Sequence, residues 1–202
     1  MAKIISYVFH PLLMPTYTVM LLMWMAPPVL RPIGENLYFN VLLIVTVTSF
    51  FLPVLMLSVL KATRLIPDFY LEDRKSRIAP FLFVLVIYGV SAYMFFNQFN
   101  FAKIFYVAYS ATSLLILWLV LITFFWKISI HSASVAGVFG IIYAVQLKFP
   151  EVDLLGAMAV VLLMAGVVGS SRLALQQHTY PQVLAGLALG VINCGVITFL
   201  FL

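Results

Sequence analysis

The sequence predicts an all-α fold, a polytopic transmembrane bundle of about six to seven helical spans, and its composition carries that prediction. Hydrophobic residues make up 65% of the 202 residues, and charged residues make up only 8%. The mean hydropathy of +1.17 lies far above the values of soluble domains. A water-soluble globular fold is therefore excluded.

The charged residues divide the chain into seven uncharged runs, and each run is long enough for one span. Every run has at least 18 residues, and about 20 helical residues cross the hydrocarbon core. Lipid offers the backbone no hydrogen-bond partner, so each run has to be helical. No stretch is left for a second domain, and we expect a single integral-membrane domain over 1–202. The runs are 4–30, 36–60, 78–102, 104–126, 128–147, 154–171 and 173–202.

The first run is the least regular because it is rich in proline. Its prolines leave only residues 16–26 uninterrupted, about 16 Å of helix at 1.5 Å per residue. Pro11 and Pro15 are compatible with a first helical turn, which favours a complete but kinked span. A re-entrant or interfacial segment is the alternative.

Three polar connections fall on one side of the predicted membrane. Counting alternate crossings places 61–80, 127–131 and 172–181 together, and they hold two of the three histidines and most of the cations. Loops that converge on one face are the arrangement that a site requires. Lysine and arginine favour the cytoplasmic side, but several of these cations are candidate ligands, so the sidedness stays open.

The third connection carries the strongest functional signal. Arg172 and His178 stand six residues apart near the end of a hydrophobic run. An arginine at the bilayer centre costs about 2.5–3.5 kcal/mol, so such residues usually serve a site or an interface. The planar guanidinium of Arg172 suits phosphate oxygens, and His178 can act as a nucleophile or a base.

The other two connections add groups that bind anions. Ser129 and His131 stand at the start of a helix, where hydroxyl, imidazole and backbone N–H groups can donate to an anion. Arg74, Lys75 and Arg77 add positive charge from the first connection. The three connections together predict a phosphate-sized cradle with two imidazoles, which suits phosphoryl transfer through a phosphohistidine.

The third connection resembles a motif of the type 2 phosphatidic acid phosphatase superfamily, whose relatives include vanadium haloperoxidases. That motif reads Ser-Arg-x5-His-x3-Asp. Here Arg172, His178 and Gln182 follow it in spacing, with Gln182 in place of the Asp. The trailing Val-Leu-Ala-Gly of 183–186 is also typical of the family.

The two other motifs of the family are Lys-x6-Arg-Pro and Pro-Ser-Gly-His, and both have counterparts here. Ser129 and His131 look like the Ser and His of the second motif. The segment 76–81 resembles a degenerate form of the first motif. The resemblance therefore covers a phosphatase-like core of about residues 72–190.

The resemblance implies a role for each candidate site residue. His178 is the expected nucleophile, and His131 is the expected general acid. Gln182 stands where the family has the residue that orients the nucleophile. The expected substrate-binding residues are Arg172, Ser129, Arg77, Arg74 and Lys75.

The resemblance also implies what the protein works with. Family members hydrolyse phosphates without a metal or cofactor, and this sequence shows no obvious metal-ligand cluster. The expected partner is a phosphorylated membrane lipid, such as phosphatidic acid, phosphatidylglycerol phosphate, undecaprenyl diphosphate or lipid A, and not a nucleic acid. We expect a multi-pass protein of a bacterial inner (cell) membrane. Neither the individual lipid nor the oligomeric state follows from the sequence.

The chain departs from the family pattern within the motifs. Gln182 can accept a hydrogen bond but carries no charge, and the analogous Asp-to-Asn change in serine proteases lowers kcat about 10⁴-fold. Ile130 replaces a glycine, and Glu72 and Ala79 replace a lysine and an arginine. A catalytically degenerate member that binds phosphorylated lipid without turnover is therefore the alternative function.

Some residues outside the motifs have other interpretations. Asp68 and Asp73 are similar to the Mg²⁺-diphosphate loops of prenyltransferases, but a second acidic loop is missing, so this class is a distant third. We expect His10 to be an interfacial anchor. The small residues expected to act as notches for helix packing are Gly137, Gly140, Gly186 and Gly190.

Overall fold

Helices form nearly all of the chain that the structure describes. The structure is a computed structural model, and it describes residues 1–66, 74–97 and 101–202. No strand occurs in these ranges, so the all-α prediction is confirmed. The elements are α1 (Ala2–Val8), η1 (Pro11–Leu13), α2 (Met14–Met25), η2 (Pro27–Leu30), η3 (Glu35–Leu37), α3 (Tyr38–Thr46), the π-helical turn η4 (Val47–Phe51), α4 (Leu52–Ala62), η5 (Lys75–Arg77), α5 (Ile78–Asn97), α6 (Lys103–Thr123), α7 (Ile130–Lys148), α8 (Leu155–Ala174) and α9 (Tyr180–Phe201).

Within the described residues, seven helical stretches are long and apolar enough to cross a membrane. They are Ala2–Met25, Glu35–Ala62, Ile78–Asn97, Lys103–Thr123, Ile130–Lys148, Leu155–Ala174 and Tyr180–Phe201. The first stretch is broken between α1 and α2, where His10 caps the short helix η1 and Pro11 begins it. This break matches the kink that the prolines predict, and the chain is a multi-pass membrane protein.

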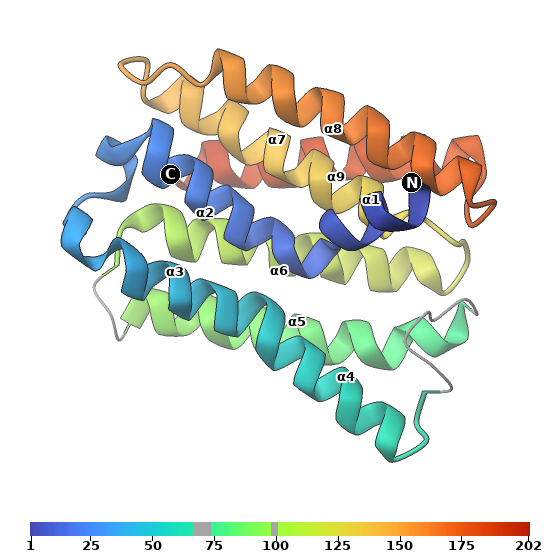
Figure 1. Ribbon diagram of the computed structural model, residues 1–202. Coiled ribbons are helices and arrows are strands. Elements are labelled where there is room, and N and C mark those ends of the chain that lie inside the picture. Colours follow the sequence, from blue (N-terminus) through green and yellow to red (C-terminus); the bar gives the residue numbers. More distant parts are fainter. Residues whose placement is uncertain (67–73, 98–100) are drawn as a thin grey trace.

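Helices α7 and α9 lie side by side, and the other helices are arranged around them (Figure 1). Helices α6 and α8 contact this pair, α5 packs on α6, and α1 packs on α8. The broken helix α3–α4 contacts α2 and α5. Large apolar side chains such as Phe39, Leu55 and Leu163 are more than half exposed on the outer helix faces, where lipid can cover them.

Direct backbone contact joins α7 to α9. A Cβ atom on Gly190 would lie 2.1 Å from the Ala133 carbonyl oxygen, and a Cβ on Gly186 would lie 2.5 Å from another carbonyl oxygen at the start of α7. On the facing helix, a Cβ on Gly140 would lie 2.6 Å from the Val191 carbonyl oxygen. Only glycine allows such an approach, so the predicted packing notches are confirmed at these positions.

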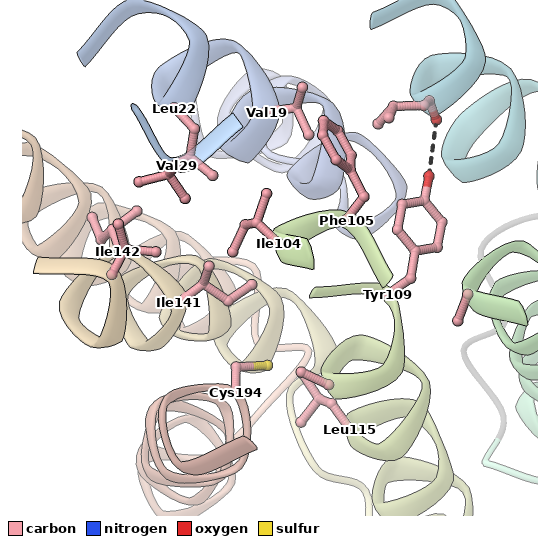
Figure 2. Packing of buried hydrophobic residues seen from close by; sticks show 14 of the residues in the cluster. Val19, Leu22, Val29, Ile104, Phe105, Tyr109, Leu115, Ile141, Ile142 and Cys194 are labelled. Carbon is pink, nitrogen blue, oxygen red and sulfur yellow. Dashed lines mark hydrogen bonds between the residues drawn. The ribbon is translucent and has the colours of Figure 1, made fainter. Parts of the chain in front are cut away.

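Hydrogen bonds attach the broken helix α3–α4 to the core. The π-helical turn η4 leaves backbone carbonyls available, and two tyrosines use them. Tyr109 donates to the Val45 carbonyl oxygen at 3.3 Å (Figure 2). It also shares a 2.7 Å bond with Thr48. Tyr88 donates to the Ser49 carbonyl oxygen at 3.2 Å. These bonds hold the outer helix in a region where lipid provides no polar partner.

Replacing Gly190 with alanine is expected to destabilise the bundle. The added methyl group overlaps the Ala133 carbonyl oxygen, and overpacking of this kind costs about 1–3 kcal/mol. Gly166→Ala on α8 is the matched control, because no atom lies within 4 Å of a Cβ placed there. Reversible unfolding in mixed micelles measures both variants. Equal free energies of unfolding would contradict the close contact between α7 and α9.

Candidate functional site

The segments that lead into α5, α7 and α9 lie at the same end of the bundle (Figure 1). Four of the predicted site residues border one cavity there, which has a volume of about 210 Å³. They are Arg77, His131, Arg172 and His178. The structure therefore brings together residues from all three of the polar connections identified in the sequence.

Away from the cationic side chains, the cavity is apolar. It continues between α2, α5, α6 and α7, and Phe105, Ile141 and Cys194 are among the residues that line it. Phe105 and Leu119 both line it from α6, and they stand about 21 Å apart along the helix at 1.5 Å per residue. The cavity is thus long, narrow and apolar, with a cationic end.

A tight turn after α8 places His178. Gln176 adopts the left-handed conformation (φ 53°), which reverses the chain, and Thr179 then caps α9. His178 is buried, and its Nδ1 lies 3.2 Å from both the Lys127 carbonyl oxygen and Gln182 Oε1. Both neighbours are acceptors, so Nδ1 carries the proton and Nε2 carries the lone pair.

Gln182 connects the second polar segment to the third. Its Oε1 accepts the Thr179 N–H (3.1 Å) in a capping box, which sets the orientation of the amide. Its backbone carbonyl accepts the N–H of Ser129 (3.2 Å), the residue that caps α7. Gln182 therefore orients the imidazole of His178 through a neutral oxygen.

Arg172 is buried with one of its donors unused. Its Nη1 donates to Ser6 Oγ (3.1 Å) and its Nη2 donates to Gln177 Oε1, and both partners are neutral. Only 6% of the residue is exposed, and its Nε has no hydrogen-bond partner among the described residues. No described acidic residue borders the cavity. An anionic ligand in the cavity would supply the negative charge that this guanidinium lacks.

The other predicted phosphate ligands have different positions. Arg77 is buried and borders the cavity. Ser129 is also buried, but its hydroxyl bonds Ser132 Oγ (2.9 Å) and accepts the Ser132 N–H, so it caps α7 and does not line the cavity. Arg74 is half-buried and also absent from the lining, and the side chain of Lys75 lies outside the described part. The direct ligand contacts predicted for Ser129 and Arg74 are therefore not found in this cavity.

Two more imidazoles border the cavity, and one of them is unexpected. His131 lines it as predicted, close to the backbone of Ser6 in α1. His10 lines the same cavity, with its ring centroid 5.8 Å from that of His131. The interpretation of His10 as an interfacial anchor is therefore wrong. The predicted topology could have indicated this position, because alternate crossings place the N-terminus on the same side of the membrane as the three connections.

His178 is neutral at physiological pH. Burial is the main reason that its pKa falls to about 4, and the positive charges of Arg77 and Arg172 lower it further. A neutral imidazole with its lone pair on Nε2 is the nucleophilic form. The unfolded chain binds this proton near pH 6.5 and the folded chain only near pH 4, so acidification between these values destabilises the fold.

Cations and imidazoles dominate the ligand chemistry of the described residues. Among these residues, no group of three or more His, Cys, Asp or Glu side chains could hold a metal ion. Asp68 and Asp73, which a magnesium-diphosphate loop would need, lie outside the described residues. The donors that do border the cavity suit an anion rather than a metal.

No protein-family model matches this chain, and no curated protein or solved structure is significantly similar to it. The resemblance to the phosphatidic acid phosphatases therefore rests on the three motifs. The chemistry of the site is inferred from its geometry and charge.

Removing the guanidinium of Arg77 is expected to raise the pKa of His178. The positive charge of Arg77 opposes protonation of the imidazole, so Arg77→Gln should move the pKa up from about 4, while burial keeps it below 6.5. Arg31→Gln is the control, because Arg31 is exposed and does not border the cavity. A ¹⁵N NMR titration of the imidazole in micelles measures the shift. An unchanged pKa in Arg77→Gln would show that the two side chains are not neighbours.

Proposed function

We propose that this protein is an integral-membrane lipid phosphatase that hydrolyses a lipid phosphate or diphosphate through a phosphohistidine intermediate. One observation carries the proposal: Arg172, which is buried with only neutral partners, and Arg77 both border the cationic end of a largely apolar cavity. A phosphate group supplies the missing anion. A hydrocarbon tail suits the apolar remainder.

The shape of the cavity supports a substrate with one hydrocarbon chain. Its volume of about 210 Å³ is drawn out along about 21 Å of α6. Side chains such as Leu22, Val84 and Ile141 line it from three other helices. A channel this narrow accommodates one extended chain better than two, which favours prenyl or alkyl phosphates and diphosphates.

The first chemical step uses the lone pair on Nε2 of His178. It attacks phosphorus, and an N–P bond forms as the bond from phosphorus to the leaving oxygen breaks. Arg77 and Arg172 stabilise the charge that collects on the phosphoryl oxygens. The Nδ1–H of His178 stays bonded to the Lys127 carbonyl and to Gln182, which keeps the ring in the reactive tautomer.

His131 is the proposed proton donor to the leaving oxygen. A neutral imidazole carries one N–H and one lone pair, so the ring of His131 first takes up a proton on its second nitrogen. The negative charge of a bound phosphate favours that uptake. After the lipid product leaves, His131 accepts a proton from the water that attacks phosphorus. The N–P bond then breaks and inorganic phosphate is released.

The resemblance to type 2 phosphatidic acid phosphatases supports the same roles. Its motifs assign the nucleophile to His178, the acid to His131 and phosphate binding to Arg172 and Arg77. The resemblance is also the support for a bacterial inner (cell) membrane as the location, since a multi-pass bundle is compatible with many membranes.

One residue favours binding without turnover as a second candidate function. Gln182 supports Nδ1 of His178 with a neutral oxygen, so a cationic phosphohistidine lacks the stabilisation that a carboxylate provides. The same cavity would then bind a phosphorylated lipid and hold it. Turnover and binding, measured side by side, distinguish the two functions.

Purified protein in detergent is expected to release inorganic phosphate from farnesyl phosphate and dodecyl phosphate faster than from two-chain phosphatidic acid. His178→Ala removes the nucleophile and should reduce release to the background rate. Binding of these lipids without release above that of His178→Ala would establish the binding function instead. Absence of both binding and release would overturn both functions. Release that requires Mg²⁺ would favour the prenyltransferase-like alternative based on Asp68 and Asp73.

Gln182→Glu is expected to speed turnover about tenfold or more, because a negative charge stabilises the cationic imidazole. Glutamate keeps the side-chain length and the oxygen that accepts from His178 and Thr179. Gln182→Met is the matched control, because it keeps the length without an acceptor and should slow turnover. Single-turnover phosphate release measures the three proteins. Equal rates would mean that residue 182 does not support the nucleophile.

A further inference from the structure

The N-terminal segment completes the site on a side that the motifs do not cover. Helix α1 packs on α8, and Ser6 accepts the Nη1–H of Arg172 at 3.1 Å. The backbone of Ser6 also lies close to His131, and His10 in the same segment borders the cavity. The N-terminal segment therefore holds Arg172 in position through Ser6 and adds an imidazole to the cavity.

The hydrogen bonds of His10 determine which of its nitrogens carries a proton. His10 caps η1, and its Nδ1 accepts the Leu12 N–H at 3.3 Å. An accepting Nδ1 has no proton, so the neutral ring carries its proton on Nε2. In the part of the chain that the structure describes, no residue accepts a bond from this Nε2. The ring therefore contributes an unused donor to the lining of the cavity.

His10 and His178 present complementary groups at the same ring atom. Nε2 of His178 has a lone pair, whereas Nε2 of His10 has a proton. A phosphoryl group suits both kinds of group, because its phosphorus accepts the attacking lone pair while its oxygens accept hydrogen bonds. Arg172 borders the same cavity and supplies positive charge for those oxygens. An apolar ligand would cover the His10 donor without accepting from it, which costs free energy.

We propose that His10 is a further substrate-binding residue, whose Nε2–H donates to a phosphoryl oxygen of the lipid that Arg172 holds. The proposal rests on the proposed function, because it takes the ligand to be a phosphorylated lipid. It makes the N-terminal segment part of the site: Ser6 positions Arg172, and His10 contacts the ligand.

Two substitutions separate the ligand donor from the helix cap. His10→Asn keeps an oxygen near the place of Nδ1, which can still cap η1, and removes the distal donor. His10→Gln carries an amide N–H near the place of Nε2 and removes the cap. Binding of dodecylphosphonate, a non-hydrolysable single-chain probe, is measured by calorimetry in phosphatidylcholine nanodiscs. Dodecanol reports on the tail alone, and the thermal unfolding midpoint reports on the cap.

His10→Asn is expected to weaken dodecylphosphonate binding about tenfold to a hundredfold, the range for a lost hydrogen bond to a charged group. Its dodecanol binding and its unfolding midpoint should match those of the original protein. His10→Gln should recover most of the phosphonate affinity while unfolding at a lower temperature. Unchanged phosphonate binding by His10→Asn would overturn the role of His10 and leave the proposed function standing. A failure of the original protein to bind dodecylphosphonate would overturn both.

Discussion

The backbone contact between α7 and α9 is the constraint on which the rest of the site depends. Lipid provides no hydrophobic drive for helices to associate, so close packing at small residues has to hold them together. Gly186 and Gly190 allow α9 to touch carbonyl oxygens in the first turns of α7. His131 lies in the first turn of α7 and His178 lies two residues before α9, so the glycine contact sets the spacing of the two imidazoles.

The buried guanidinium groups explain the electrostatics around that contact. Arg172 has neutral partners at Ser6 and Gln177, so its charge acts on whatever else borders the cavity. Together with burial and Arg77, it keeps His178 neutral, and the two acceptors at Nδ1 leave the lone pair on Nε2. The positive charge and the lone pair are therefore the two features on which the proposed phosphorylated ligand depends.

Much of the site was predictable because each motif is local. Arg172 and His178 are separated by one tight turn, so their spacing in sequence nearly determines their proximity. The motif predicts that Ser129 contacts the ligand. A serine just before a helix also signals an N-cap, and the hydroxyl of Ser129 forms that cap. His10 was missed because it reaches the cavity from the first, proline-broken helix, which shares no motif with the other three segments.

Hydropathy and the length of each run establish the membrane class, the helical spans and the side on which the polar connections meet. They can do so because each span depends only on its own composition and on the thickness of the bilayer. Packing between distant segments decides the remainder. It sets the tautomers of His10 and His178, the unmet donor of Arg172 and the depth of the apolar cavity. Each of these depends on hydrogen-bond partners and contacts that come from other helices. These features therefore cannot be predicted from the sequence pattern of a single segment.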